Sequence, residues 1–276
     1  MQSKQVNSAE PAISIVTVCY NSAETIGRSF ESVLSQDMND MEYVVIDGAS
    51  SDNTLRIIED YRNRFAEKGI EMIVVSESDK GIYDAMNKGL ARCRGELIGI
   101  LNSDDHYEPF ALQRMRKAAL DLPESGILYG FLRLMIGENE LKVYRYNFDL
   151  ILSDLSAGVE AAVQHPTCFV RRTVYDEIGR FDTSYRLAAD YDFLLRAKVR
   201  GIKFHGLDDV ITTFVSGGAT DTTPFEVRLK ERYKAQRTNG LIDEPSYRMK
   251  MRELKLLPLK KLKGRIVQAV FRLGRR

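Results

Sequence analysis

The first hundred residues alternate between two hydrophobic periods, and this alternation limits the possible folds more than any other feature. Short apolar runs typical of buried strands are separated by stretches with apolar residues at helical spacing. The expected strands are ISIVTVC (13–19), EYVVID (42–47), IEMIVVSE (70–77) and ELIGILN (96–102). Because amphipathic helices join these strands, right-handed crossovers and a mostly parallel sheet are expected. We predict a Rossmann-like, mixed α/β sheet flanked by helices.

The rest of the chain continues the alternation less regularly. Helices are expected at 23–36, 52–65, 82–93, 109–120 and 188–201, and further strands at 126–136, 141–147 and 165–172. The apolar residues expected to face inward include Leu55, Ile58, Tyr61 and Phe65 of the second helix, and Ile82, Ala85 and Met86 of the third. No linker or repeat interrupts the chain before residue 253, so we expect one α/β domain over 1–222 and a helical extension over 223–276.

The composition agrees with a soluble globular domain. Apolar residues make up 44% and charged residues 29% of the 276 positions, values that are ordinary for a chain with a sizeable core. No apolar run approaches the ~20 residues of a membrane span. The N-terminus is polar, and Cys19, Cys93 and Cys168 are scattered without zinc-site spacing. We therefore expect a cytosolic protein in a reducing compartment.

Polar residues follow each of the first four expected strands. They are Tyr20-Asn21, Asp47-Gly48-Ala49-Ser50, Glu77-Ser78-Asp79-Lys80 and Ser103-Asp104-Asp105. In a parallel sheet the carboxyl ends of the strands meet at one rim, where ligands of open α/β sheets bind. The turn after the first strand, YNSAET, contains no glycine, which argues against a dinucleotide-binding loop. A nucleotide at this rim needs another anchor, and metal-bridged phosphates are the obvious candidate.

Asp104 and Asp105 stand side by side directly after a buried strand. Because adjacent carboxylates repel each other, they belong either to a solvated turn or helix cap, or to a site where a cation lies between them. Mg²⁺ is commonly held by one or two carboxylates together with substrate phosphates and water. Their position beside other polar strand ends favours a Mg²⁺ or Mn²⁺ site.

Four segments in register resemble one enzyme family. They are SIVTVCYNSAETIGRSFESVLSQ, VVIDGASSDNT, SDKGIYDAMNKGLARCRGELIGILNSDD and AADYDFLLR, in order over roughly residues 13–200. Together they are similar to the family 2 glycosyltransferases of bacterial polysaccharide assembly. The resemblance implies a GT-A fold, a hexosyl or N-acetylhexosaminyl transfer with inversion, a nucleotide-sugar donor, most commonly a UDP-sugar, and a saccharide acceptor.

The resemblance also implies roles for individual acids. Asp47 matches the aspartate that contacts the donor base. Asp104 and Asp105 match the DXD-like signature, with Asp104 by the ribose or metal and Asp105 ligating the metal that bridges the diphosphate. Asp190 in AADYDF matches the general base, and Ala189 replaces the glutamate that usually precedes it. The expected donor-binding set comprises Thr17, Tyr20, Asn21, Asp47, Ser50, Asp79, Asn87, Asn102 and Asp104.

Several assignments remain open at this point. Asp192 is the rival base, and helix capping is the alternative role for either acid. The three histidines have no settled role: His106 follows the acidic pair, the resemblance places His165 on the acceptor side, and His205 is an alternative metal ligand.

Two other function classes compete with the transferase. A nucleotidyltransferase acting on sugar phosphates would also use paired acids and Mg²⁺, but we expect such an enzyme to have a glycine-rich basic loop in place of YNSAET. A non-catalytic nucleotide-sugar-binding protein would not need Asp190. Hydrolysis of the donor without an acceptor would separate an enzyme from a binding protein.

The C-terminal segment is strongly basic. Residues 254–276 hold eight of the 40 Lys and Arg and none of the 39 Asp and Glu, which leaves 32 basic against 39 acidic residues elsewhere, a balance of −7. After Pro258, apolar residues recur at helical spacing among these cations. Such a segment suits an anionic membrane surface, where a lipid-linked acceptor would wait on the cytoplasmic face. Packing on the domain or on a second subunit is the alternative, and nucleic acid is not an expected partner because the body is acidic.

Overall fold

The computed structural model describes residues 10–136, 139–145, 164–217 and 223–252. Its strands are β1 (Ile13–Cys19), β2 (Met41–Asp47), β3 (Glu71–Ser76), β4 (Leu97–Ile100), β5 (His106–Tyr107), β6 (Ile127–Ile136), β7 (Asn139–Tyr144), β8 (Phe169–Arg171) and β9 (Phe204–Val215). Its helices are α1 (Ile26–Leu34), α2 (Thr54–Glu67), α3 (Ile82–Leu90), α4 (Ala111–Asp121), α6 (Arg172–Ile178), α7 (Ala189–Val199) and α9 (Phe225–Thr238). Residues 244–252 are also helical.

The strands form one mixed sheet in the order β3-β2-β1-β4-β8-β6-β9-β5, and β7 pairs with β6. β1 is parallel to β2 and to β4, β2 is parallel to β3, and the long β6–β9 ladder is also parallel. The ladders that involve β8, β5 and β7 are antiparallel. The predicted mixed, mostly parallel α/β sheet is therefore confirmed.

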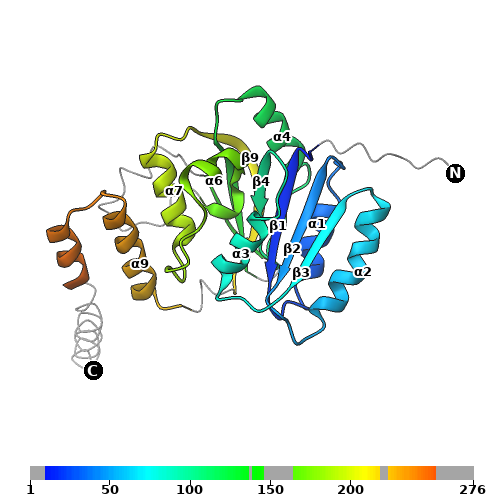
Figure 1. Ribbon diagram of the computed structural model, residues 1–276, viewed down its shortest axis with the longest axis horizontal. Helices are drawn as coiled ribbons and strands as arrows, with labels where there is room; N and C mark the ends of the chain where they lie inside the picture. Colours follow the sequence, from blue (N-terminus) through cyan, green and yellow to red (C-terminus); the bar gives the residue numbers. More distant parts are fainter. Residues whose placement is uncertain (1–9, 137–138, 146–163, 218–222, 253–276) are drawn as a thin grey trace, which may run out of the picture.

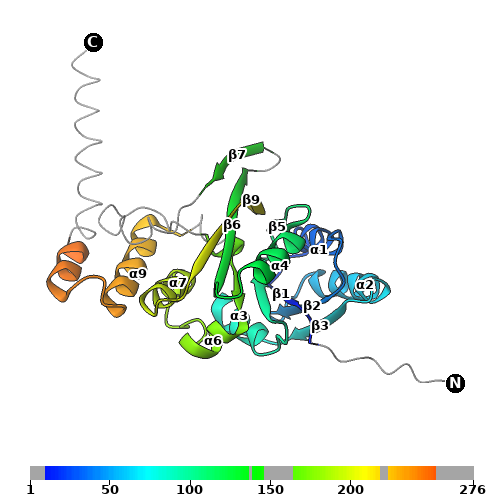
Figure 2. The same cartoon turned by 90° about the horizontal axis from the view of Figure 1, so that it is seen from above.

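Helices cover both faces of the sheet and bury two separate cores (Figures 1 and 2). One core joins alternate residues of β1 and β2, such as Ile15 and Tyr43, to α1, α2 and α4. The other joins the remaining residues of these strands, such as Val16 and Ile46, to α3, α6 and α7. Strands buried on both faces explain why the sequence shows continuous apolar runs there. Figure 2 shows β7 and the end of β6 projecting from this body.

Three details differ from the expectations. Leu55 is 39% and Ile82 41% exposed, because Thr54 and Tyr83 take the buried positions in the first turns of α2 and α3. The strand predicted at 165–172 was too long. Residues 165–167 form a 3-10 turn that begins at His165 and contains Pro166, and β8 is only three residues long. Proline has no N–H to donate to a strand ladder, so it shortens this strand.

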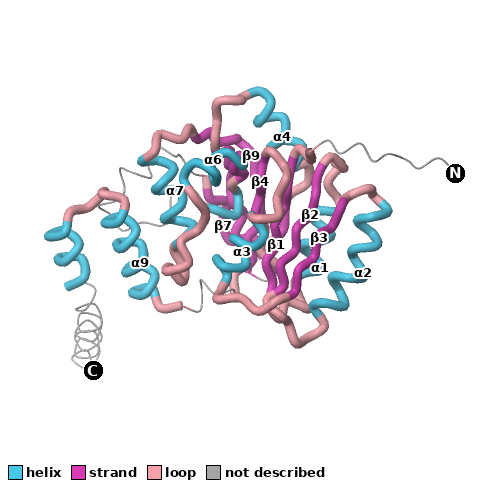
Figure 3. The backbone as a smooth tube through the Cα atoms, viewed as in Figure 1, coloured by secondary structure: helices cyan, strands magenta, loops and turns pink. Residues whose placement is uncertain are grey.

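The carboxyl ends of β1, β2 and β3 lie at one edge of the sheet. Their register is aligned, with Cys19 opposite Asp47 and Asp47 opposite Ser76. In Figure 3 the loops that follow these strands meet at the lower edge of the sheet. We call this edge, together with the loop after β4, the carboxyl rim. It brings together segments far apart in the sequence, as the pattern of polar strand ends predicts.

Candidate active site

The loops after β1 and β2 are bound to each other across the carboxyl rim. The backbone N–H of Asn21 donates to Ser50 Oγ at 2.8 Å, and the N–H of Ser51 donates to Asn21 Oδ1 at 2.9 Å. Asn21 and Ala49 have φ values of 48° and 60°, a left-handed region that non-glycine residues rarely adopt and that costs about 1–3 kcal/mol. The cross-loop hydrogen bonds hold this strained conformation in place.

Asp47 makes several hydrogen bonds to residues of the carboxyl rim. Its side chain is fully buried at the end of β2. It accepts hydrogen bonds from the backbone N–H of Ser50 at 3.0 Å, from the Ser50 hydroxyl, and from Ser76 Oγ at 2.7 Å. Both carboxylate oxygens therefore orient Ser50 and Ser76 in this structure, and the contact with a donor base that the resemblance implies stays a prediction.

Tyr20, Gly48 and Asp79 converge from three different loops. A Cβ atom on Gly48 would lie 2.6 Å from Asp79 Oδ2 and 3.4 Å from the Tyr20 ring, so a larger residue there would displace the Asp79 carboxylate. Asp79 Oδ1 accepts a hydrogen bond from the Gly81 N–H at 2.8 Å, and Tyr20 is 64% exposed. An exposed aromatic face beside a fixed carboxylate suits a planar ring that carries N–H donors.

Two members of the predicted donor-binding set do not present their side chains at the rim. Thr17 is fully buried, and its hydroxyl pairs with the Tyr43 hydroxyl at 2.8 Å. Asn87 uses both ends of its amide on Phe181: its Nδ2 donates to the carbonyl oxygen at 2.8 Å, and its Oδ1 accepts from the N–H at 3.0 Å. Thr17 therefore stabilises the core, and Asn87 ties α3 to the segment that precedes α7. In this structure both side chains are engaged within the protein, and a role of these two residues in donor binding stays a prediction.

The adjacent acids of the β4 loop have different environments. Asp105 is fully buried, and its carboxylate accepts hydrogen bonds from the Val215 N–H and from Asn102 Nδ2, each at 3.2 Å. Burial raises the pKa of Asp105 well above its ordinary range, and the neighbouring Asp104 raises this pKa further. Asp104 is half-buried. The pair therefore has an inner carboxylate that links the β4 loop to the end of β9 and an outer carboxylate nearer to solvent.

The residues at this loop fit a divalent cation. Among the described residues there is no group of three His, Cys, Asp or Glu side chains arranged to hold a metal ion. However, Asn102 Oδ1 is buried and accepts no hydrogen bond from the described residues. This oxygen and the carboxylate of Asp104 are hard ligands of the kind that Mg²⁺ and Mn²⁺ take from proteins, with phosphates and water completing the coordination.

Asp190 lies in the first turn of α7 and reaches the first turn of α3. Asp190 Oδ1 accepts a hydrogen bond from the Tyr83 hydroxyl at 3.0 Å and one from the Tyr191 N–H at 2.8 Å. Because α3 follows the end of β3, its first turn lies by the carboxyl rim, and Tyr83 therefore places Asp190 at that rim. Asp190 is half-buried, so this residue is not enclosed by the protein as a core residue is. The helix N-terminus favours its negative charge.

Asp192, the rival base, has a structural environment. Its side chain is almost fully buried, and it pairs with Arg196 Nε at 2.8 Å. Its other oxygen accepts a hydrogen bond from Asn239 Nδ2 of the segment after α9 at 2.9 Å. Both oxygens are therefore used to join α7 to the C-terminal part of the chain. This geometry favours Asp190 over Asp192 as the group that meets a substrate.

Tyr83, which contacts Asp190, belongs to an aromatic cluster with Phe181 and His165. Sequence reasoning missed Tyr83 and Phe181. Tyr83 and Phe181 pack ring against ring at 5.7 Å, and His165 contacts Phe181 edge to face at 5.3 Å. Burial lowers the pKa of His165, and the charge of Asp190 opposes this shift. Tyr83 could have been found in the segment GIYDAMNKG, because a tyrosine that is buried at the start of a helix needs a polar partner for its hydroxyl.

The other two histidines occupy different places. His106 pairs with Thr213 in the β5–β9 ladder, and its Nδ1 is buried without a hydrogen-bond partner in the described chain. His205 is exposed at the start of β9, whereas Val215 at the end of that strand contacts Asp105. Between His205 and Val215, β9 runs beside β6 from Leu128 to Met135, a span of about 23 Å, so His205 cannot share a metal with Asp105.

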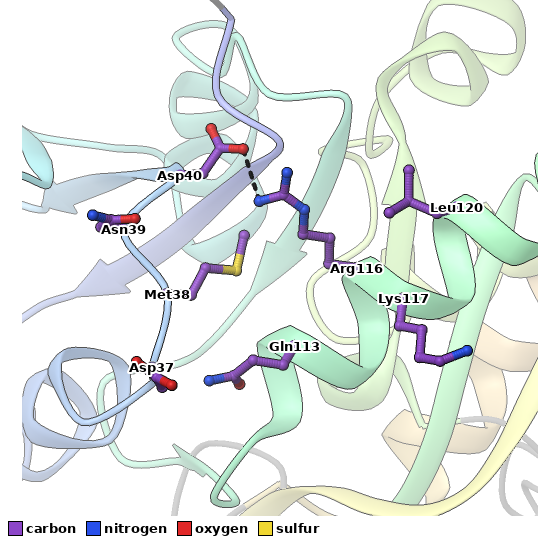
Figure 4. Close-up of a pocket in the computed structure, with 8 residues that line it drawn as sticks. All are labelled: Asp37, Met38, Asn39, Asp40, Gln113, Arg116, Lys117 and Leu120. Atoms are coloured by element: carbon purple, nitrogen blue, oxygen red, sulfur yellow. Dashed lines mark ion pairs between the residues drawn. The ribbon is translucent and has the colours of Figure 1, made fainter.

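A hollow of ≈ 330 Å³ lies elsewhere on the molecule, between the loop before β2 and helix α4 (Figure 4). Asp40 and Arg116 form an ion pair of 2.7 Å across it, and Met38 and Leu120 contribute apolar surface. Because Met38 and Asp40 precede β2, this hollow lies at the amino edge of the parallel strands. It is therefore separate from the carboxyl rim.

Solved structures with the same arrangement are glycosyltransferases. S. aureus TarS 1-349 in complex with UDP-GlcNAc superposes with a TM-score of 0.65 at 20% identity, covering 85% of this chain and 69% of that one. Mannosyltransferase PcManGT from Pyrobaculum calidifontis, in complex with GDP-Man and Mn2+, superposes with a TM-score of 0.64 at 17% identity, covering 86% of this chain and 66% of that one. The fold is therefore of the GT-A type.

Sequence comparison identifies the family. The glycosyl transferase family 2 model matches residues 14–179. A PGL/p-HBAD biosynthesis glycosyltransferase of Mycobacterium bovis is 31% identical over 190 residues, covering 68% of this chain and 70% of that protein. Escherichia coli chondroitin synthase is 26% identical over 257 residues, covering 91% of this chain and 35% of that protein. The chain belongs to glycosyl transferase family 2 and is a glycosyltransferase.

Proposed function

We propose that this glycosyltransferase moves a sugar from a nucleotide-sugar donor to a saccharide acceptor with inversion at the anomeric carbon. The observation that carries the proposal is the contrast between two acids of α7. Asp190 is half-buried at the carboxyl rim beside Tyr83, whereas Asp192 is enclosed in an ion pair. A partly exposed carboxylate at the ligand-binding edge of the sheet is where a base that meets an acceptor hydroxyl belongs.

The donor would lie across the loops of β1, β2, β3 and β4. The exposed Tyr20 ring and the Asp79 carboxylate suit a nucleobase, and the Asn21–Ser50 hydrogen bond fixes the loops beneath it. UDP-sugars are the favoured donors because they are the commonest in the family. The TarS complex holds UDP-GlcNAc and the archaeal mannosyltransferase holds GDP-Man, so both nucleotides belong in a test of this chain.

Asp104 and Asn102 would hold Mg²⁺ or Mn²⁺. Asp105, which the resemblance implies as the metal ligand, is hydrogen-bonded to Val215 and Asn102 and would support these two ligands. When bound, the cation neutralises charge that develops on the diphosphate leaving group. The side chains of this protein act on the acceptor. Asp190 accepts the proton of the acceptor hydroxyl while that oxygen forms a bond to C1, and the bond from C1 to the diphosphate oxygen breaks. Tyr83 keeps the Asp190 carboxylate oriented by donating to Oδ1.

The acceptor is proposed to be a lipid-linked saccharide of cell-surface polysaccharide synthesis, reached from the cytoplasmic face of the membrane. Within the described residues no helix is long and apolar enough to cross a membrane. The basic segment 254–276 lies outside the described residues, and its charge supports attachment to an anionic bilayer. Family membership favours this function over the nucleotidyltransferase and over a non-catalytic nucleotide-sugar-binding protein.

A thermal-shift screen tests the donor directly. UDP- and GDP-sugars are added with and without Mn²⁺, and the unfolding midpoint of the full-length chain is recorded. A donor present at about a hundred times its dissociation constant should add about 2.7 kcal/mol to the free energy of unfolding. The proposal predicts a shift that requires both nucleotide sugar and Mn²⁺. Absence of a shift with every nucleotide sugar at millimolar concentration would contradict it.

A further inference from the structure

Helix α9 belongs to the predicted C-terminal extension, yet it packs against the helix that carries Asp190 (Figure 1). Gln236 Nε2 donates to the Tyr191 hydroxyl at 3.0 Å. Lys234 Nζ donates to Ser184 Oγ at 3.0 Å and lies 4.1 Å from the centre of the Tyr185 ring. Leu229 and Ala235 on the same helix are buried. Helix α9 is therefore attached to the chain on both sides of the start of α7.

Glu231 makes the most specific of these contacts. Its Oε1 accepts a hydrogen bond from the Arg186 N–H at 2.9 Å. Its Oε2 accepts from the Leu187 N–H at 2.8 Å and from the Ala188 N–H at 3.0 Å. One carboxylate thus holds three consecutive backbone amides. Bonds from N–H groups to an ionised carboxylate are about twice as strong as those between neutral groups.

The three amides lie directly before the proposed base. Ala188 is the N-cap residue of α7, and no side chain of its own caps the helix. Asp190 follows two residues later. The side chain of Asp190 is fixed by Tyr83 and by the Tyr191 N–H, but the backbone that carries it enters the helix through residues 186–188. The position of Asp190 therefore depends on how firmly that entry is held.

We propose that Glu231 is a positioning residue for the transfer reaction: by holding the amides of residues 186–188, it fixes the start of α7 and thereby places Asp190 against the acceptor. Helix α9 is then part of the catalytic unit, although the sequence pattern places it in an extension beginning at residue 223. This inference rests on the proposed role of Asp190 as the base. Glu231 does not contact the reacting atoms; it acts through the backbone.

The test compares Glu231→Ala and Glu231→Gln with the control Glu244→Gln in the full-length chain. Glu244 makes ion pairs with Arg237 of α9 and with Arg248, and no described contact joins it to α7. Three quantities are measured: amide hydrogen exchange in residues 186–190, kcat with a soluble acceptor, and the KM for the nucleotide sugar. Thermal midpoints show which variants fold. Glu231→Gln keeps the size of the side chain, so this variant tests the positioning role if the alanine variant does not fold.

The expected pattern separates positioning from general support of the fold. Glu231→Ala should exchange residues 186–190 faster and lower kcat about 10- to 100-fold, the scale on which small misplacements act, while the donor KM stays near the wild-type value. Glu231→Gln should lower kcat about 3- to 10-fold, because its single amide oxygen can accept only the bonds made to one of the two carboxylate oxygens, and a neutral oxygen accepts more weakly. Glu244→Gln should behave like the wild type.

Other outcomes overturn the inference in distinguishable ways. Wild-type kcat in both Glu231 variants, unchanged exchange at 186–190, or a loss of donor binding equal to the loss of kcat would each refute the positioning role while leaving the proposed function intact. A nearly wild-type kcat in Asp190→Asn would instead refute the assignment of Asp190 as the base, and this inference with it.

Discussion

At the scale of single residues, the adjacent acids Asp104 and Asp105 differ in burial and therefore in their proposed roles. The inner acid, Asp105, is hydrogen-bonded to Asn102 and to the end of β9, and its desolvation disfavours the charged form. The outer acid, Asp104, is half-buried in the same loop as Asn102, whose side-chain oxygen is buried without a hydrogen-bond partner among the described residues. A pair of like charges is tolerable where one member is enclosed and a cation can approach the other.

The metal proposal predicts that loss of the outer acid, Asp104, makes turnover more dependent on the Mn²⁺ concentration. Asp104→Asn should lower turnover at a fixed, subsaturating Mn²⁺ concentration at least about 10-fold, since even outer partners of a metal site change affinity by 10- to 100-fold. Raising the Mn²⁺ concentration should recover part of that activity, and EDTA should abolish wild-type turnover. Titration of activity with Mn²⁺ measures both effects. Full wild-type activity in EDTA would rule out the metal.

His165 makes the stability of the fold depend on pH. Burial holds the pKa of this histidine below its ordinary value of 6.5. As the pH falls, His165 therefore binds a proton in the unfolded chain at a higher pH than in the folded chain. The free energy of unfolding should therefore fall as pH drops below about 6.5, by at most 1.36 kcal/mol per pH unit for one group. Above that pH the contribution is constant.

Urea unfolding between pH 7.5 and 5.5 measures this dependence, and His165→Gln should flatten it. Burial also lowers the pKa of His106, so part of the slope should remain in the variant. The carboxylates with lowered pKa values, such as Asp84 and Glu31, lose their stabilising effect only at lower pH. An identical slope in His165→Gln and the wild type would show that His165 is not the titrating group.

At the scale of elements, two helical glycines provide a matched pair for testing how α3 packs. A Cβ on Gly89 of α3 would lie 2.4 Å from Val16 Cγ1 of β1, whereas a Cβ on Gly27 of α1 would meet only Tyr61 at 3.7 Å. Gly89→Ala should lower the free energy of unfolding by about 1–3 kcal/mol through overpacking. Gly27→Ala should raise it by up to about 1 kcal/mol through helix propensity. Equal effects in urea unfolding would show that the α3–β1 contact is not tight.

The elements also show what the sequence can and cannot predict. Periodicity predicts β1 to β4 and α1 to α3 because each has a single strong pattern, and it places the polar strand ends at one rim. It fails at Leu55 and Ile82, since a shift of one residue in the first turn changes which side chain is buried. It cannot reveal the contacts of Asn87 with Phe181, or of Glu231 with 186–188, because these join residues about 45 to 94 positions apart.

At the scale of the whole molecule, the basic segment 254–276 should determine where the enzyme acts. Deleting residues 255–276 should release the protein from anionic liposomes and leave turnover of a short soluble acceptor largely intact, because the described site lies before residue 253. Liposome co-sedimentation at low and high salt measures binding, and salt should weaken it. If the full-length protein does not bind anionic liposomes at low salt, the segment has another role.

The central claim is that one rim binds the donor and Asp190 removes the acceptor proton. The most direct measurement compares Asp190→Asn with Asp192→Asn for nucleotide release during transfer and for donor affinity by calorimetry. Asp190→Asn should lower the rate by about 10²–10⁴-fold, the usual contribution of a general base, and leave donor affinity nearly unchanged. Asp192→Asn should mainly lower stability, since Asp192 pairs with Arg196 and Asn239. A nearly silent Asp190→Asn together with an inactive but folded Asp192→Asn would contradict the account.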